Sequence, residues 1–220
     1  MFIQLTNDQK SIFNEIVNSE YKIYFIDGPG GLGKTFLYKT LIHYYISLNK
    51  KTLSMAWTGI ASILLPKGMT SHRTFRLPLD LNSIETAFLK FESDKKKLRE
   101  VDIIIWDEAS MIPKKALEII DQTLRDVCFN DIPFSGKLII LGGDFRQILP
   151  VMKCGHKNSI IEETIKFSVL WSLFKVLKLT QNIRSENKEF ASLFLELGEG
   201  KINPFIIPNK WKTNNICKEI

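Results

Sequence analysis

Hydrophobic residues along the chain follow two different patterns, and each pattern predicts a different kind of secondary structure. Short runs that are almost continuously apolar and rich in β-branched residues predict strands that are covered on both faces. We expect strands over five such ranges: Lys22–Ile26, Thr52–Trp57, Val101–Trp106, Lys137–Leu141 and Phe174–Leu179. Between them, apolar residues recur every three or four positions, which predicts helices. The helical ranges are Lys34–Leu48, Gly59–Leu65, Ser83–Leu98, Lys114–Cys128 and Glu189–Leu197.

The alternation of strand and helix predicts an α/β fold, with a mostly parallel sheet and helices on both of its faces. The 220 residues suit one domain, and we see no internal repeat or low-complexity linker. We place the domain at residues 1–200. From residue 201 the periodicity is lost and Pro204 and Pro208 interrupt the chain, so we expect an extended tail over residues 201–220.

A glycine-rich segment, "GPGGLGKT", lies between the first predicted strand and the helix that follows it. It matches the phosphate-binding pattern G-x-x-x-x-G-K-[ST] in the structural context that this pattern requires. Backbone N–H groups can point inward at phosphate oxygens only where no Cβ obstructs them, and the helix N-terminus adds its dipole. The alternative is a tight turn with a chance lysine. The predicted phosphate-binding residues are Gly28, Pro29, Gly30, Gly31, Leu32, Gly33, Lys34 and Thr35.

Two carboxylates follow the apolar run in "VDIIIWDEAS". They fall at the carboxyl end of a strand, where ligands bind in sheets of this kind. We expect Asp107, together with the Thr35 hydroxyl, to hold Mg²⁺, and Glu108 to deprotonate the attacking water. A strand that simply ends in a polar turn is the alternative. Beside a phosphate-binding loop, the pair predicts hydrolysis of Mg²⁺–ATP. A simple kinase would not need Glu108, and we find no NKxD element of a GTPase.

Composition limits the class of protein and its cellular compartment, but it does not identify a binding partner. Hydrophobic residues make up 45 % of the chain and charged residues 25 %, and no apolar run approaches the length of a membrane span. The start of the chain has no secretory signal pattern, and three scattered cysteines indicate a reduced, intracellular setting. The net charge of +6 is compatible with a polyanion partner but is weak support for one. The run "ESDKKKLRE" most simply forms a solvated helix face.

One more segment, "LGGDFRQILPV", points to a class of ATPase. Gln147 in it can sense the γ-phosphate and pass its presence to a neighbouring surface. Together with "DEAS", "TSHRTFRLP" and "LTQNIRS", this segment resembles the petite-integration-frequency (PIF) family of superfamily 1 DNA helicases. The likeness is greatest to the branch found in plants and Helitron-type transposons. It covers residues 5 to about 200 and implies a RecA-like fold, with ATP and Mg²⁺ as cofactors.

The resemblance also implies roles for single residues. In "LTNDQ", Gln9 is similar to the glutamine that reads the adenine edge, and Arg184 in "NIRS" resembles the arginine that reaches the γ-phosphate. Hydroxyl and backbone N–H groups grip phosphates without reading sequence, and an aromatic ring can stack on a base for roughly 1–3 kcal/mol. The positions that match the single-stranded DNA path are Thr58, Gly59, Thr70, His72 and Phe75.

Each of these roles has a plainer alternative. Gln9 could be a first-turn helix residue after an Asn7 N-cap, His72 a structural histidine, Phe75 a core residue and Arg184 a surface ion-pair residue. Two positions depart from the family pattern. Ser135 replaces a glycine, which matters only if the turn needs a positive φ. Trp57 stands where a small residue or proline is more usual, and we favour the core over a stacking surface for it.

Three functional hypotheses follow. The first is an ATP-dependent 5′-to-3′ DNA helicase that acts on single-stranded and forked duplex DNA. For this hypothesis the resemblance implies roles in repair, recombination and telomere maintenance. It also implies a location in the nucleus, with the mitochondrion as the alternative. The second is a module that binds ATP and single-stranded DNA without unwinding, as in a partial transposon copy. It is favoured because the second RecA-like domain's motifs do not occur in this sequence. The third is an ATPase unrelated to nucleic acid.

Overall fold

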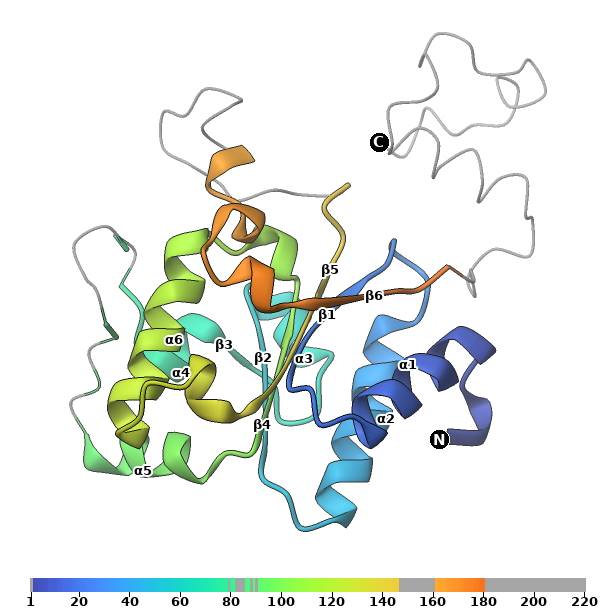
Figure 1. Cartoon of the computed structure of the whole chain (residues 1–220), viewed down its shortest axis with the longest axis horizontal. Helices are drawn as coiled ribbons and strands as arrows, with labels where there is room; N and C mark the ends of the chain where they lie inside the picture. Colours follow the sequence, from blue (N-terminus) through green and yellow to red (C-terminus); the bar gives the residue numbers. More distant parts are fainter. Residues whose placement is uncertain are drawn as a thin grey trace, which may run out of the picture.

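The computed structural model describes residues 2–78, 80–81, 86–87, 89, 91–146 and 161–180. Within these ranges the chain forms a parallel sheet of six strands in the order β3-β2-β4-β5-β1-β6, with helices on both faces (Figure 1). The strands are β1 (Ile23–Asp27), β2 (Thr52–Ala56), β3 (Met69–Thr70), β4 (Ile103–Asp107), β5 (Leu138–Gly143) and β6 (Lys175–Lys178). The α-helices are α1 (Asn7–Asn18), α2 (Lys34–Ser47), α3 (Gly59–Ile63), α4 (Ser71–Phe75), α5 (Glu92–Glu100) and α6 (Lys114–Cys128). Five short 3₁₀ helices complete it: η1 (Phe2–Gln4), η2 (Ala109–Met111), η3 (Pro133–Gly136), η4 (Ile165–Phe167) and η5 (Trp171–Leu173).

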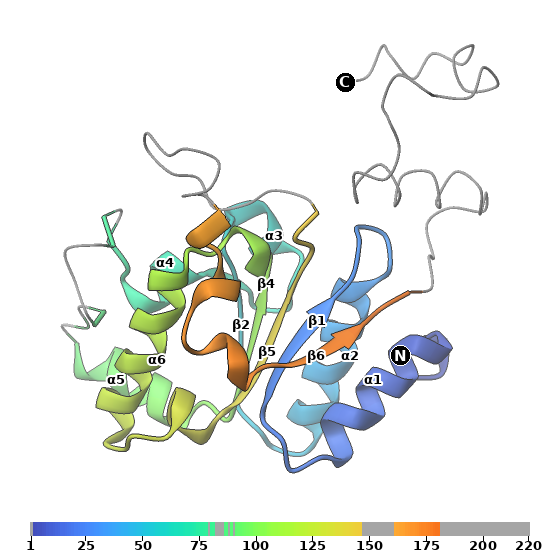
Figure 2. The ribbon, with the colours of Figure 1, turned by 45° about the horizontal axis from the view of Figure 1, so that its top comes forward.

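The sheet separates two hydrophobic cores because successive strand residues point to opposite faces. In β4, Ile104 and Trp106 face one core, which α6 and the single turn of α4 cover, whereas Ile103 and Ile105 face the other, which α1 and α2 cover. Figure 2 shows the two helical layers on either side of the strands. Strands β1, β4 and β5 are therefore apolar at nearly every position, as the sequence predicts for strands covered on both faces, whereas β6 at the edge of the described sheet is mostly exposed.

All five predicted strands are confirmed, with ends displaced by at most two residues. The helix over Lys114–Cys128 has the predicted bounds, and those over Lys34–Leu48 and Gly59–Leu65 end one or two residues early. The predicted helix over Ser83–Leu98 is confirmed only in part: α5 covers it from Glu92 and runs on to Glu100, the described residues 86, 87, 89 and 91 are not helical, and Ser83 lies outside the described residues. The backbone N–H of Ala87 donates to the Thr123 hydroxyl (2.8 Å), which fixes Ala87 against α6. The predicted helix over 189–197 and the tail over 201–220 lie outside the described residues.

The turn before β5 explains one departure from the family pattern. Ser135 has φ 58° and the preceding Phe134 has φ 50°, both in the left-handed region that favours glycine. The Ser135 hydroxyl pairs with the Asn130 side-chain amide (2.7 Å), and the backbone N–H of Phe134 donates to the buried Asp121 carboxylate (2.5 Å). These contacts hold a non-glycine turn in place, so the turn does require the positive φ that a glycine would supply at least cost.

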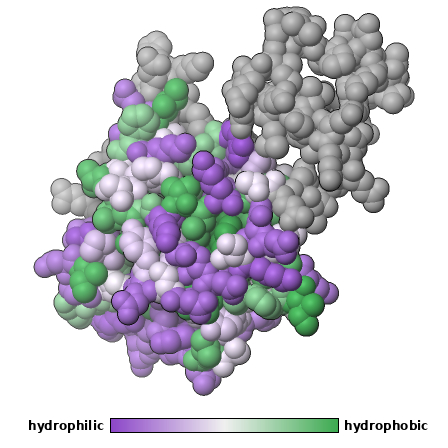
Figure 3. All heavy atoms as spheres, turned by 45° about the vertical axis from the view of Figure 1, so that its right-hand side comes forward, coloured by the Kyte–Doolittle hydropathy of each residue, from purple (hydrophilic) through white to green (hydrophobic). Residues whose placement is uncertain are grey.

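Several large hydrophobic residues of the described chain are exposed, among them Ile60, Ile63 and Leu64 in and after α3. On the face in Figure 3, hydrophilic residues predominate and hydrophobic ones form small groups. Among the described residues, none of the helices combines the length and the apolar character needed to cross a bilayer.

Candidate functional site

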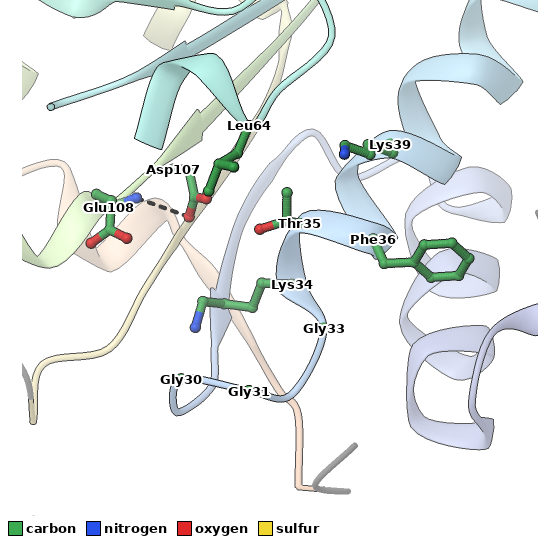
Figure 4. A pocket seen from close by; sticks show the side chains of 10 residues that line it. All are labelled: Gly30, Gly31, Gly33, Lys34, Thr35, Phe36, Lys39, Leu64, Asp107 and Glu108. Atoms are coloured by element: carbon green, nitrogen blue, oxygen red, sulfur yellow. Dashed lines mark hydrogen bonds between the residues drawn. The ribbon is translucent and has the colours of Figure 1, made fainter. Parts of the chain in front are cut away.

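The phosphate-binding loop lies at the carboxyl edge of the sheet, where β1 ends and α2 begins. Gly31 (φ 90°) and Gly33 (φ 74°) adopt left-handed backbone conformations that a side chain would disfavour. Gly33 is the N-cap of α2, so the helix starts at Lys34 with its first N–H groups directed at the loop. The loop borders a pocket of about 620 Å³. The residues that line this pocket are Gly30, Gly31, Gly33, Lys34, Thr35, Phe36, Lys39, Leu64, Asp107 and Glu108 (Figure 4).

The side chain of Lys34 lies inside the loop. Its Nζ donates to the carbonyl oxygens of Gly28 and Pro29, the latter at 3.1 Å. Burial lowers the pKa of Lys34, and the nearby Asp107 and Asp144 carboxylates act against that shift. The loop therefore concentrates one positive charge and several backbone donors at the same point, which is the chemistry that a phosphate chain requires.

Asp107 and Glu108 face the loop from the end of β4. Asp107 is the last residue of that strand and is only 5 % exposed. Burial raises its pKa to about 6, and the backbone N–H of Glu108, which donates to the Asp107 carboxylate (2.9 Å), and Lys34 act in the opposite direction. Glu108 has a left-handed backbone (φ 58°), so the chain turns sharply there. Figure 4 shows the two carboxylates across the pocket from Thr35 and Lys39.

Thr35 and Asp107 offer the oxygen donors that Mg²⁺ prefers. Magnesium usually takes one or two protein carboxylates and fills its other positions with water and substrate phosphates. A buried carboxylate whose charged form is penalised gains more from a neighbouring cation than an exposed one would. In the described part of the chain, His, Cys, Asp and Glu side chains form no group of three or more that could hold a metal. The residues therefore fit an ion that is shared with a nucleotide.

The end of β5 lies beside the same loop. Burial acts to raise the pKa of Asp144, but hydrogen bonds from Arg146 outweigh it and the net pKa is lowered. Arg146 donates to that carboxylate from its backbone N–H (3.1 Å) and from Nε (2.8 Å). A Cβ added to Gly142 would lie 1.5 Å from the hydroxyl of Tyr38, a fully buried residue of α2. The glycine thus lets α2 pack directly against the strand that leads toward Gln147.

Gln9 has contacts that the sequence did not predict. It is the third residue of α1, whose N-cap is Thr6 rather than Asn7, and it is 1 % exposed. Its Oε1 accepts from the Thr6 backbone N–H (3.0 Å), and its Nε2 donates to the carbonyl oxygens of Leu32 (3.2 Å) and Gly33 (3.3 Å). All of its polar side-chain atoms therefore contact the helix cap or the phosphate-binding loop.

The predicted DNA-contact residues follow β2 and β3 at the same edge of the sheet. Thr58 is the N-cap of α3 and Thr70 that of α4, and each hydroxyl accepts a backbone N–H (3.3 and 3.2 Å). Gly59 is exposed, and a Cβ there would meet nothing within 4 Å. Two threonines and a bare backbone thus lie close to one another, since β2 and β3 are paired.

The two remaining positions of that set differ in burial. His72 is half-buried, burial lowers its pKa, and its ring centroid lies 4.5 Å from that of Trp57. Trp57 is itself half-buried against the core that contains α6. Phe75 is fully buried in that core, so its ring offers no face to a base. The expectation that Phe75 lines the DNA path is therefore corrected in favour of the core alternative.

Two predicted residues, Gln147 and Arg184, lie outside the described residues. Conversely, several pocket residues were not predicted. Lys39 is four positions after Thr35, the helical spacing that returns a side chain to the same face, so that periodicity could have indicated it. Leu64 follows α3, and only the folded sheet brings it to the pocket. Arg146 does not line the pocket, but it lies 3.9 Å from the Asp27 carboxylate, directly before the loop.

Comparison with known proteins gives a consistent result. Residues 4–205 match a family model described as PIF1-like helicase. The ATP-dependent DNA helicase RRM3 of Saccharomyces cerevisiae is 28 % identical over 210 residues, which cover 91 % of this chain and 28 % of the yeast protein. The ATP-dependent DNA helicase Pif1 of Bdellovibrio bacteriovorus is 28 % identical over 206 residues, covering 91 % of this chain and 44 % of that protein.

Comparison with solved structures points to the same family as the sequence comparison. Pif1 helicase from Bacteroides, in complex with ADP-AlF3 and single-stranded DNA, is 28 % identical with a TM-score of 0.79 and aligns with 90 % of this chain and 47 % of its own. A structure that describes unwinding at forked duplex DNA by two coordinating Pif1 helicases has a TM-score of 0.80 at 28 % identity, over 91 % of this chain and 49 % of that one. The chain thus spans less than half the length of each of these relatives.

Proposed function

Because the chain belongs to the PIF1-like helicase family, we propose that it binds ATP with Mg²⁺, hydrolyses it, and couples the reaction to movement along single-stranded DNA. The observation that carries this proposal is the pocket in which the loop lysine, the Thr35 hydroxyl and the two carboxylates at the end of β4, Asp107 and Glu108, lie together. These groups have complementary tasks in one reaction, and the fold brings them to one edge of the sheet.

In this proposal the loop positions the triphosphate. The N–H groups at the start of α2 and the ammonium of Lys34 bind its phosphate oxygens, so Lys34 exchanges its loop carbonyls for phosphate. Thr35 and Asp107 would hold a Mg²⁺ ion, which when bound would supply positive charge beside the phosphates. Glu108 lies at the turn after β4, where it accepts a proton from the water that attacks the γ-phosphate. We further propose that Gln147 and Arg184 contact the γ-phosphate.

The edge that carries the loop also carries the proposed DNA contacts. Thr58 and Thr70 each accept one N–H but retain a hydroxyl hydrogen, and with the exposed backbone at Gly59 they can bind successive phosphates without reading bases. Movement of α3 on nucleotide binding would reach Thr58 and Gly59 directly, because Thr58 is the N-cap of α3 and Leu64 at its other end lines the nucleotide pocket. We propose that this contact transmits the nucleotide state to the DNA-binding edge.

The finer assignments rest on the sequence resemblance and on what the relatives are named for. We propose 5′-to-3′ movement, action on single-stranded and forked DNA, and a second RecA-like domain as the partner in the complete protein. Roles in repair, recombination and telomere maintenance, a nuclear location and membership of the plant and Helitron-type branch are proposed on the same basis.

The test is ATP hydrolysis by the purified chain with and without single-stranded DNA. We expect DNA to stimulate hydrolysis and Lys34→Ala to abolish nucleotide binding. Lys97→Ala is the matched control, because Lys97 lies on α5 with its side chain 76 % exposed and not among the residues that line the pocket. Equal nucleotide affinity in Lys34→Ala and the unchanged protein would remove the site assignment. Hydrolysis that DNA does not stimulate would favour an ATPase unrelated to nucleic acid.

A further inference from the structure

Tyr38 carries a hydroxyl group that is buried without a hydrogen-bond partner. The residue lies on α2 and is fully buried, and among the described residues no group pairs with its phenol oxygen. A buried polar group that makes no hydrogen bond costs folding free energy, and a phenylalanine at the same position would avoid that cost. The position of the hydroxyl shows which group could become its partner.

The hydroxyl lies against the sheet beside Asp107. A Cβ on Gly142 of β5 would be 1.5 Å from the Tyr38 hydroxyl oxygen, so this oxygen lies directly over the glycine. Strands β4 and β5 pair Ile105 with Ile140, and both side chains enter the core that α1 and α2 cover. Since side chains alternate along a strand, Asp107 and Gly142, two positions further on, face the same side and are neighbours. The glycine thus leaves space beside Asp107, and the hydroxyl lies in it.

Helical spacing and charge connect the hydroxyl to the same site. Tyr38 is three positions after Thr35, the spacing that places two side chains on one face of a helix. Burial raises the pKa of Tyr38, and the Asp107 and Glu108 carboxylates raise it further, so the phenol remains a neutral donor. The Oδ1 atom of Asp107 accepts the backbone N–H of Glu108, whereas Oδ2 accepts no hydrogen bond from the described residues. A donor and an acceptor that are both unused therefore lie on one side of the sheet.

We propose that the Tyr38 hydroxyl donates a hydrogen bond to the Asp107 carboxylate in the site with Mg²⁺ bound, and that Tyr38 is thereby a positioning residue for this metal ligand. The inference rests on the proposed Mg²⁺–ATP site and deepens it. Carboxylates that bind metals are themselves held by hydrogen bonds, and loss of the donor typically weakens metal binding by about 10–100-fold. A neutral donor also favours the charged form of the buried carboxylate without adding a positive charge that would repel the ion.

Calorimetric titration with ATP, in a chelator and at a series of Mg²⁺ concentrations, tests the contact. The proteins are the unchanged chain, Tyr38→Phe, Asp107→Asn, the double variant and Tyr45→Phe. Tyr45→Phe is the matched control, because it removes a hydroxyl from the same helix that donates instead to the Ile16 carbonyl (3.4 Å). Urea unfolding of each protein without nucleotide gives a second readout that does not depend on the metal.

We expect Mg²⁺ to strengthen ATP binding roughly tenfold less in Tyr38→Phe than in the unchanged chain or in Tyr45→Phe. The affinities for ATP in the chelator should stay within about twofold of one another, because the hydroxyl acts only through the metal ligand. In the Asp107→Asn background, Tyr38→Phe should cause no further change. The unfolding free energy of Tyr38→Phe should not fall, since no hydrogen bond is lost, whereas that of Tyr45→Phe should fall.

A full response to Mg²⁺ in Tyr38→Phe would overturn the inference. An equal loss of ATP affinity with and without Mg²⁺, or a loss of unfolding free energy alone, would also overturn it, because a merely structural hydroxyl gives these patterns. Failure of the unchanged chain to bind ATP under either condition would overturn the ATP site itself and the inference with it. The behaviour of the unchanged chain therefore distinguishes the two failures.

Discussion

Replacing Asp107 by asparagine should stabilise the nucleotide-free protein at neutral pH. The structure buries this carboxylate at the end of β4, where burial raises its pKa from about 3.8 to about 6. One pKa unit corresponds to about 1.4 kcal/mol, so the charged form costs roughly 3 kcal/mol of folding free energy. Asparagine has nearly the same shape, has no charge to desolvate, and can still accept the backbone N–H of Glu108.

The sign of the pH dependence follows from the direction of the shift. The folded chain holds the Asp107 proton more tightly than the unfolded chain does. The contribution of Asp107 to stability is therefore fully present below about pH 4 and is lost as the pH rises through about 6. The unfolding free energy of Asp107→Asn should exceed that of the unchanged chain by an amount that grows between pH 4 and about 6.5 and is then constant.

The measurement is urea unfolding of both proteins across pH 4 to 8, in the presence of a metal chelator. Asp131→Asn serves as the matched control, because Asp131 is an exposed carboxylate that does not line the pocket, and it makes the same chemical replacement elsewhere on the chain. A difference for Asp107→Asn that is independent of pH would show that the carboxylate carries no burial penalty. Asp107→Asn should also bind ATP with an affinity that responds little to added Mg²⁺.

Three further outcomes are expected. Glu108→Gln should retain ATP affinity while turnover falls by at least about a hundredfold, because the amide cannot accept the proton; unchanged turnover would remove Glu108 as the base. Gly142→Ala should lower the unfolding free energy in urea by about 2–3 kcal/mol, since its Cβ collides with Tyr38, and Tyr38→Phe should recover part of the loss; additive effects would contradict the contact. Single-stranded DNA should bind with little sequence preference and a log–log salt slope of about −0.7 per phosphate, and Thr58→Val with Thr70→Val should weaken it; salt-independent binding would contradict a phosphate grip.

Most of the sheet could be predicted from the sequence because a parallel strand that is buried on both faces appears as a continuous apolar run. Every position of β4 is buried, so the run is apolar throughout and its bounds are nearly those of the apolar stretch. Two elements lacked such a signal. β3 has only two residues, too few for any period, and α4 is a single turn that begins directly after it. Ala87 lies in a stretch with the composition of a helix, but its backbone N–H is bound to Thr123, a contact that no local pattern contains.

The site shows the same division between local and tertiary information. The loop and the carboxylates after β4 could be predicted, because a motif and its flanking elements lie together in sequence. Gln9 could not, since its partners at Leu32 and Gly33 are set by how α1 packs beside α2. Phe75 shows the limit of motif matching, because a family position and a core position look alike when both require an aromatic residue. The two can be distinguished only in the structure, by whether the aromatic side chain is exposed or buried in the core.

The place of β1 in the sheet has a consequence for how the protein is made. The strand that leads into the phosphate-binding loop pairs only with β5 and β6, at residues 139–143 and 175–178, among the described residues. During synthesis it therefore emerges from the ribosome long before either partner, and pairings so distant in sequence form slowly. The hydrogen bonds from Thr180 to Asp8 (3.0 and 2.5 Å) join α1 to the residues that follow β6. The nucleotide site is thus completed late in folding, and a nucleotide that binds only the finished site would favour the native chain over unfolded competitors for chaperones and proteases.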